Sequence, residues 1–361
     1  FAGPHTVTHH KSSLLVGGRF SFYNAGSGTN MSNHMYRLGP VHQGLMERGC
    51  KTASGSYILF PARIGAFTVV KGRHYNHPDT GAFPFSYLIE TSEGSLLLPA
   101  ANLAAAGTVR DIEKWAARDR RTGEKRDLLR ISPWTPPLIE KIRRAATLLE
   151  SFEGRGAEVI GHGVRIKTGG ISKMSNVYKN AVDRYVGDIL VTRVLSGKIP
   201  AAPALPIDGP WIDVAGLIAP LQEVEALAAK VESGAIASSA SLQQKMTALH
   251  ENFSEWEWTY VRRLIAGDSA QIDTPQLVDA IDRWARAVSF LNELTLADAR
   301  KEFSGPTLIP FGADGDETIR DFDFQAVRGS FEKHPLVEKL TRETEAVQQT
   351  ARELIARLKG N

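Results

Sequence analysis

Histidines are concentrated at the start of the chain. Seven of the ten lie within the first 77 residues: His5, His9, His10, His34, His42, His74 and His77. Histidine titrates near neutral pH and is the commonest metal ligand in proteins. This concentration points to the N-terminal fifth of the chain as the place to look for proton transfer, substrate binding or metal binding.

His34 is the best candidate for a general base. An imidazole with a pKa of about 6.5 is well suited to take a proton from a hydroxyl or amine at neutral pH. Two nearby amides, Asn30 and Asn33, could hold a substrate or orient the ring. Arg37 could meet a phosphate or a carboxylate. His34 could equally be a core histidine whose hydrogen bonds are satisfied.

A second polar cluster follows about forty residues later. It contains two histidines with cationic and acidic neighbours: Lys71, Arg73, His74, His77 and Asp79. If a coil of short strands takes about 18 residues, positions 34 and 74 are about two coils apart. At the usual spacing between strands this is about 10 Å. One groove could therefore hold both clusters, with His74 and His77 as further catalytic candidates.

A third group of candidates lies on a predicted helix over 110–121. Arg110, Lys114 and Arg118 are four residues apart, so they share one helix face. This face could clamp a phosphate, and Trp115 could stack on a base or sugar. A salt-bridged surface helix would show the same pattern. No recognised nucleic-acid-binding motif accompanies these residues, so nucleic acid is not the expected partner.

A six-residue period indicates how the N-terminal region folds. Apolar residues recur at Val16, Phe22, Met46, Ile58, Ile64 and Val70, and a small residue usually follows four positions later. This pattern favours a β-solenoid, in particular a left-handed β-helix of hexapeptide repeats. The apolar position of the period is occupied by other residues at Gly28, His34, Pro40 and Thr52. Irregular strands in a sandwich or barrel are therefore the alternative. Cys50 occupies a small-residue slot and is expected to be structural.

Beyond residue 82 the pattern changes. Residues 85–98 predict a hairpin around Glu93-Gly94. Helical apolar stripes follow, and Asp273-Thr274-Pro275 is a typical helix start. We therefore expect a left-handed β-helix over 1–82, a hairpin and connection over 83–107, a mainly helical segment over 108–200 and a helical bundle over 211–361.

Composition excludes several classes of protein. The 361 residues are 42% hydrophobic and 23% charged, with a net charge of +3. The single cysteine excludes an internal disulfide framework and predicts a reducing, cytoplasmic location. No apolar run of about 18 residues predicts a membrane span. The chain opens at Phe1, which suggests that N-terminal coils of the β-helix are missing.

Several longer motifs resemble an uncharacterised bacterial family of the Bacteroides type. They lie at 30–44, 64–67, 72–80, 84–90 and 107–115, followed by Arg118, Asp119 and Arg121. The resemblance covers about the first third of the chain. It implies a hexapeptide-repeat, left-handed β-helix followed by a helical region, and a longer N-terminus. It implies no settled activity.

The expected function follows from the expected fold. Left-handed β-helices typically transfer an acyl group from a thioester donor to a sugar hydroxyl or amine, in grooves between the subunits of a homotrimer. The leading hypothesis is such a transferase, acting on a sugar-like, phosphorylated or nucleotide-linked acceptor, with His34 as base. A non-enzymatic binding or assembly scaffold is the alternative. A zinc site like that of γ-class carbonic anhydrases, using His5 and His10, is a further alternative, but the order and spacing fit poorly, so no metal ligand is assigned.

Overall fold

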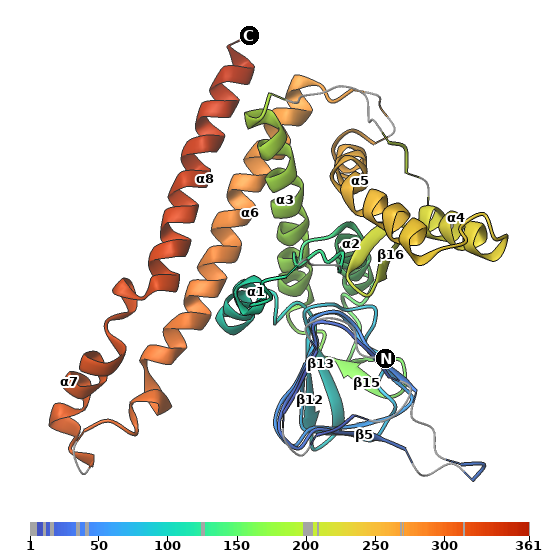
Figure 1. The fold of residues 1–361 in the computed structure, drawn as a ribbon. Coiled ribbons are helices and arrows are strands. Elements are labelled where there is room, and N and C mark those ends of the chain that lie inside the picture. Colours follow the sequence, from blue (N-terminus) through green and yellow to red (C-terminus); the bar gives the residue numbers. More distant parts are fainter. Residues whose placement is uncertain are drawn as a thin grey trace.

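The computed structural model describes most of the chain. Described are residues 6–9, 12–14, 18–33, 37–39, 43–123, 127–197, 205–207, 209–267, 269, 271–312 and 315–360. Short strands form the N-terminal part, and long helices form most of the rest (Figure 1).

The first eleven strands pair in parallel, and each of the first eight pairs with the strand three positions later in the sequence. One sheet has the order β3 (Gly18–Phe20), β6 (Gly44–Met46) and β9 (Ala62–Ile64). A second has the order β2 (Ser13–Leu14), β5 (Asn30–Ser32), β8 (Tyr57–Leu59) and β11 (Arg73–His74). The third begins with β1 (Val7–Thr8), β4 (Asn24–Ala25), β7 (Lys51–Thr52) and β10 (Val69–Lys71). Successive strands along the chain therefore belong to three different sheets.

The third sheet continues into a mixed sheet of eight strands. Its further members are β12 (Tyr87–Thr91), β13 (Gly94–Leu98), β15 (Val164–Ile166) and β14 (Glu158–Ile160). β12 pairs parallel with β10 and antiparallel with β13, and β14 and β15 form another antiparallel pair. Alternate residues of a strand point to opposite faces, so only some of the side chains in each strand face the core. Val70, Leu88, Leu97 and Ile166 are neighbours in this buried row.

This architecture corrects the expected fold class. The chain is a mixed α/β protein with a helical C-terminal half, and the assignment to a left-handed β-helix of hexapeptide repeats is wrong. The largest sheet mixes parallel and antiparallel pairs, and it recruits β14 and β15 from a segment expected to be helical. The six-residue pattern misled because it reports only one inward apolar residue per short strand. Other arrangements of short, half-buried strands meet that condition as well.

Helices cover one end of the strands and extend away from them. In chain order they are α1 (Ala106–Arg118), α2 (Pro136–Glu150), α3 (Ile171–Leu195), α4 (Leu221–Glu232), α5 (Ser239–Ala266), α6 (Thr274–Arg300), α7 (Glu317–Arg328) and α8 (Pro335–Lys359). A two-stranded hairpin of β16 (Trp211–Val214) and β17 (Leu217–Pro220) precedes α4. α3 packs against α2 and α6, and α8 lies along α6 (Figure 1). The helix start predicted at Asp273 is confirmed, because its side chain caps α6 in a capping box with Gln276.

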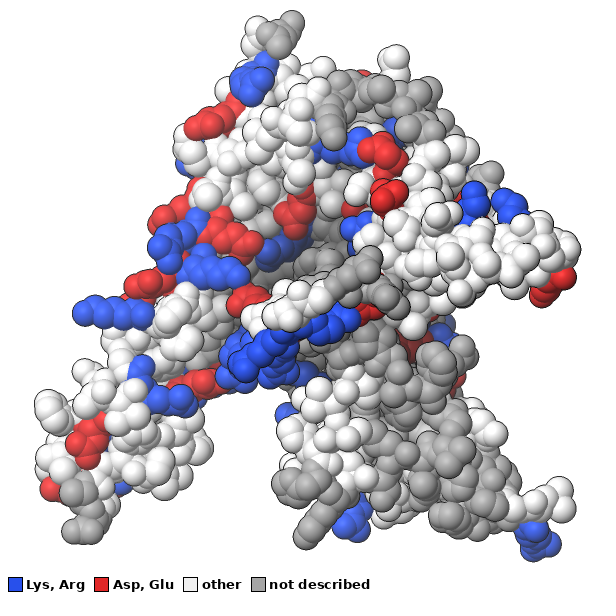
Figure 2. Space-filling view, viewed as in Figure 1, with Lys and Arg blue, Asp and Glu red and all other residues white. Residues whose placement is uncertain are grey.

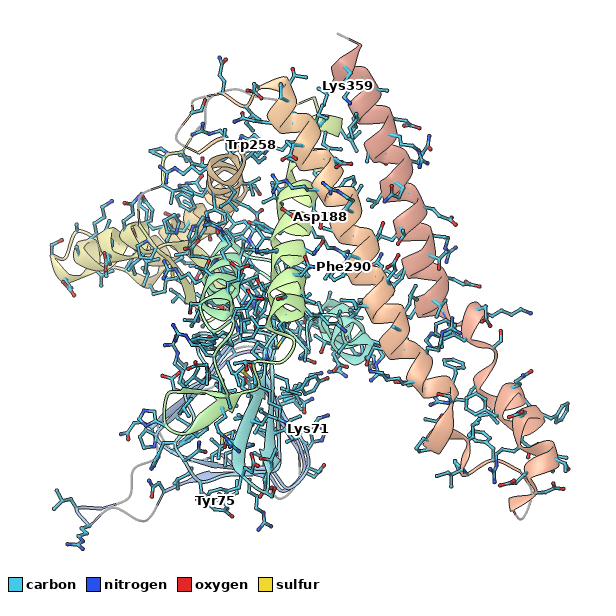
Figure 3. The ribbon with its side chains drawn as sticks, turned by 180° about the vertical axis from the view of Figure 1, so that it is seen from behind. Lys71, Tyr75, Asp188, Trp258, Phe290 and Lys359 are labelled. Atoms are coloured by element: carbon cyan, nitrogen blue, oxygen red, sulfur yellow. The ribbon has the colours of Figure 1, made fainter. Side chains whose placement is uncertain are left out.

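The contact between α3 and α6 depends on a close approach. Gly187 of α3 lies directly against Trp284, and a Cβ atom added to this glycine would lie 2.2 Å from the Trp284 Cβ. The indole Nε1 of Trp284 donates a hydrogen bond to Asp188 at 2.7 Å, which joins the two helices again. Figure 3 labels Asp188 on α3. The main core runs without a break from the buried strand residues into α2, α3 and α6. Among the described residues, none of the helices is both long and apolar enough to cross a bilayer.

Candidate functional site

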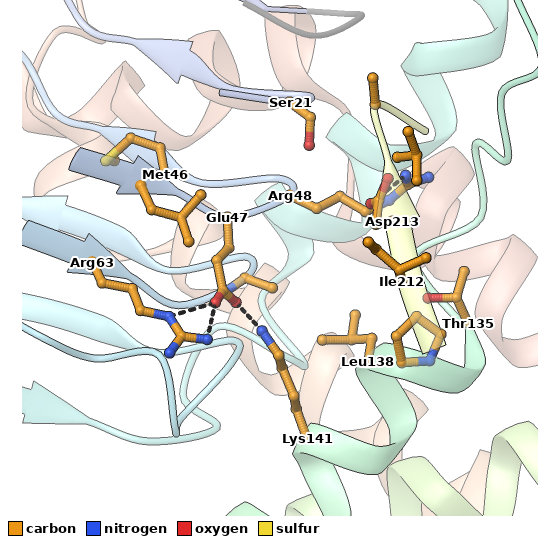
Figure 4. Close-up of a pocket in the computed structure, with 15 residues that line it drawn as sticks. Ser21, Met46, Glu47, Arg48, Arg63, Thr135, Leu138, Lys141, Ile212 and Asp213 are labelled. Carbon is orange, nitrogen blue, oxygen red and sulfur yellow. Dashed lines mark hydrogen bonds and ion pairs between the residues drawn. The ribbon is translucent and has the colours of Figure 1, made fainter. Parts of the chain in front are cut away.

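A cleft opens between the strands, the start of α2 and the β16–β17 hairpin (Figure 4). Its volume is about 580 Å³. The walls are mostly aliphatic and come from three separate elements: Leu45 and Met46 of β6, Pro137 and Leu138 of α2, and Ile212 and Val214 of β16. Charged side chains enter this apolar space at two places. Ligand sites in proteins commonly have this composition, with apolar walls and a few convergent polar groups.

Glu47 is the centre of the first charged group. It directly follows β6, and its side chain is 8% exposed. Its Oε1 accepts hydrogen bonds from Nε and Nη2 of Arg63, at 2.9 and 2.8 Å. Its Oε2 accepts from the Ala66 amide at 3.1 Å and from Nζ of Lys141 at 2.6 Å. Figure 4 shows Arg63 and Lys141 reaching this carboxylate from two sides.

The fixed carboxylate holds two partly exposed cations at the cleft. Arg63 is 45% exposed and Lys141 is 35% exposed, and both line the cleft. Gly81 makes room for the arginine, because a Cβ atom there would lie 2.4 Å from the Arg63 Nε. A guanidinium has five N–H donors and an ammonium has three, so Glu47 uses only some of them. The remaining donors can bind a further anion.

Arg48 and Asp213 form the second charged group. The Arg48 side chain is 6% exposed, and its Nη1 lies 3.2 Å from Asp213 Oδ2. Its Nη2 donates to the Ser132 carbonyl at 3.3 Å, and the guanidinium carbon lies 4.0 Å from the ring centroid of Phe22. Burial lowers the pKa of Arg48, although Asp213 opposes this. Within the described part of the chain, the buried Arg48 Nε has no hydrogen-bond partner.

The Arg48–Asp213 pair joins distant parts of the chain. Asp213 lies in β16, and its Oδ1 accepts a hydrogen bond of 2.7 Å from the Gly216 amide in the hairpin turn. The carboxylate therefore holds the turn and the buried arginine at once. Three cations and two carboxylates line the cleft, which leaves it with one surplus positive charge. In the described residues, no group of three or more acidic, histidine or cysteine side chains is arranged to hold a metal ion.

Of the residues predicted from the sequence, none that the structure describes lines this cleft. His34 lies outside the described residues, as do His5 and His10. Asn30 and Arg37 are exposed. Asn33 is buried, and its amide nitrogen donates to the Phe60 carbonyl at 2.6 Å. This asparagine therefore ties two strand segments together.

The second predicted cluster is divided between the core and the surface. His74 is fully buried, with Nδ1 2.8 Å from Ser95 Oγ and Nε2 3.2 Å from the Lys71 carbonyl, and burial lowers its pKa. Its ring serves the packing of the strands. Lys71, Arg73 and Asp79 are exposed, whereas His77 is half-buried and has a left-handed backbone conformation, with φ of 50°.

The predicted helix carries its basic residues as expected, but its tryptophan points inward. Arg110, Lys114 and Arg118 are exposed on α1. Trp115 is 7% exposed, and its ring centroid lies 4.6 Å from that of Phe22 and 5.7 Å from that of Phe67. The indole is thus part of the core and is not available to stack on a base or sugar.

Sequence reasoning missed the cleft residues. One signal was present: Glu47 and Arg48 interrupt a run of apolar and small residues, where adjacent charges are costly to bury. Their partners could not be found this way. Lys141 is 94 positions after Glu47, and Asp213 is 165 positions after Arg48.

Comparisons with known proteins match two separate segments of the chain, and both contribute residues to this cleft. Residues 1–153 match the family described as Domain of unknown function (DUF4954), and residues 203–358 match Domain of unknown function (DUF6819). These matches support an uncharacterised domain family. No curated protein and no solved structure matches the chain. Glu47, Arg63 and Lys141 lie in the first matched segment, and Ile212 and Asp213 lie in the second.

Proposed function

We propose that the protein binds a small amphipathic molecule with an anionic group in the cleft between the two matched segments. The observation that carries the proposal is the set of three side chains Glu47, Arg63 and Lys141 at an apolar cavity. Ligand sites occur preferentially between domains, where each side can contribute part of the wall. The cleft has this position, because it is lined from both segments.

Each part of the cleft has a role in this proposal. Arg63 and Lys141 bind the anionic group with the donors that Glu47 does not use. A guanidinium can meet a phosphate or carboxylate with two parallel hydrogen bonds, whereas an ammonium acts as a point charge. Glu47 fixes both cations in place before the ligand arrives, which reduces the entropy lost on binding. The aliphatic walls around Leu138 and Ile212 cover the apolar part of the ligand.

The size of the cleft narrows the ligand class. A volume of about 580 Å³ suits a small organic molecule, since ligand pockets span roughly 300–1,000 Å³. Phosphorylated sugars, sugar nucleotides and acyl thioesters all combine an anionic group with a larger body, and they are the classes to test. The apolar walls favour a ligand with an acyl or other hydrophobic part.

Group transfer by a histidine base stays a prediction. With His74 enclosed in the core, the half-buried His77 is the remaining predicted base within the described residues. Transfer of an acyl group from a thioester donor and assembly as a homotrimer belong to this same hypothesis. A bacterial origin rests on the motif resemblance. A cytoplasmic location is supported by the free, buried Cys50.

Calorimetric titration of the full chain with a sugar phosphate, a sugar nucleotide and an acyl-coenzyme A tests the binding proposal. Lys141→Met and Arg63→Gln should each weaken binding by about 10- to 100-fold, since a hydrogen bond to a charged group contributes about 1.5–3 kcal/mol. Arg144→Gln is the matched control, because Arg144 lies on the same helix, is 77% exposed and does not line the cleft. Binding of none of the three ligands, or equal binding by all variants, contradicts the proposal.

A further inference from the structure

A cluster of basic side chains lies on α1, away from the cleft. It consists of Arg110, Lys114 and Arg118 of the helix, Lys51 of β7, and one carboxylate, Asp111, and is called the α1 patch below. Lys51 forms an ion pair with Asp111, which ties the strand to the helix. Basic side chains gather over this region in the space-filling view (Figure 2). None of the five residues lines the cleft.

The α1 patch holds an unbalanced positive charge. Four cations face one carboxylate, and the surplus of three equals the net charge of the whole chain, +3. The other charges of the protein therefore cancel. Burial, together with Arg110, Arg118 and Lys114, lowers the pKa of Lys51. The three helix cations thus lie close enough to Lys51 to repel its charge.

Carboxylates limit the α1 patch at both ends of the helix and on its other side. At the N-terminus, Asp298 of α6 accepts a hydrogen bond of 3.0 Å from the Ala106 amide. At the C-terminus, Asp119 is paired with Arg121. Glu113, also on α1, is paired with Lys339 of α8. A long polyanion would have to pass these carboxylates on leaving the α1 patch.

The length of the α1 patch sets the size of its ligand. From Arg110 to Arg118 the helix rises about 12 Å, at 1.5 Å per residue. We propose that the α1 patch binds a compact polyanion, namely a di- or triphosphate group. Such a group carries several charges within a short length, so one molecule can meet all four cations. Arginines can bind its oxygens with paired hydrogen bonds, and the lysines add point charges.

Titration of the full chain with orthophosphate, pyrophosphate and inorganic triphosphate tests this inference. Affinity should rise with each added phosphate and should fall when salt is raised from about 50 to about 200 mM, as counterion release requires. The double variant Arg110→Gln/Lys114→Gln should bind triphosphate at least about tenfold more weakly. The double variant Arg144→Gln/Arg286→Gln removes the same charge from exposed positions elsewhere and should bind like the unmodified chain.

Three results would overturn the inference: equal loss in both double variants, triphosphate binding no tighter than orthophosphate, or tighter binding of a single-stranded DNA oligonucleotide than of triphosphate. Lys141→Met separates this inference from the proposed cleft ligand. That variant should leave triphosphate binding unchanged, because Lys141 belongs to the cleft and not to the α1 patch.

Discussion

Glu257 should make the stability of the protein fall as the pH rises towards neutrality. This glutamate lies on α5, is 9% exposed, and accepts a hydrogen bond of 2.9 Å from the Tyr185 hydroxyl. Burial raises its pKa to about 7, against the smaller opposing effects of Tyr185, Arg130 and Arg193. The folded state therefore holds the proton more tightly than the unfolded state. Stability is highest below the unfolded pKa of about 4.5 and is lost as the pH rises to about 7.

The size of the effect follows from the two pKa values. Ten-fold differences in proton affinity correspond to about 1.4 kcal/mol each, so the rise in pKa corresponds to about 3 kcal/mol. Glu257→Gln keeps an acceptor for the Tyr185 hydroxyl but cannot ionise. Relative to the unmodified chain, the free energy of unfolding of this variant should therefore increase by about 3 kcal/mol between pH 4.5 and pH 8.

Urea denaturation at a series of pH values measures this difference directly. Other titrating groups affect both proteins alike, so they cancel when the two curves are subtracted. Glu251→Gln, at an exposed position on the same helix, is the control for losing one carboxylate. If the difference between Glu257→Gln and the unmodified chain does not change with pH, the carboxyl group of Glu257 is not protonated in the folded state and the reasoning fails.

Three further substitutions test the packing. Gly187→Ala should lower the free energy of unfolding by about 2 kcal/mol, because overpacking against Trp284 exceeds the gain in helix propensity of about 1 kcal/mol. Gly107→Ala is the control, because the space around Gly107 is open. A Gly187→Ala variant as stable as the unmodified chain would contradict the close contact. Tyr178→Phe should cost about 1–3 kcal/mol in denaturant titrations, since it leaves a buried amide and a buried carbonyl without their hydroxyl partner. Burial lowers the pKa of His74, so the contribution of this histidine to the free energy of unfolding is present above a pH of about 6.5 and is lost as the pH falls below it. Thermal unfolding of His74→Gln should therefore show a weaker loss of stability in acid. The same dependence of stability on pH in both proteins would exclude this role.

The helices were more predictable than the sheets. Asp273 and the proline two positions later fix the start of α6 by local geometry alone, so the sequence is sufficient there. The strands of the N-terminal part are two or three residues long, which is too short for alternation to identify their partners. The eight-stranded sheet also depends on β14 and β15, which lie about sixty residues beyond β13 in the sequence. No local sequence pattern near Val164 indicates that β15 pairs with β13.

The candidate site was missed for a related reason. Histidine is a common catalytic residue, so His74 was a natural candidate. It lies in the core, where both ring nitrogens are within hydrogen-bond distance of other groups. Glu47 and Lys141 are common surface residues by type, and their importance comes from their proximity across the fold. The α1 patch could be predicted from the sequence only in part. The spacing of Arg110 and Lys114 was visible in the sequence, whereas the contribution of Lys51 required the parallel pairing of β7.

The Arg48–Asp213 pair gives the cleft a further property. Burying a charge is costly unless it is paired, and here each partner comes from a different matched segment. If the hairpin moved away, Arg48 would lose its carboxylate while remaining among Phe22 and other apolar groups. Ionic pairing therefore favours the arrangement in which both sides of the cleft are present. A ligand that contacts both walls would add its own binding free energy to that arrangement, so binding in the cleft should strengthen the contact between the two segments.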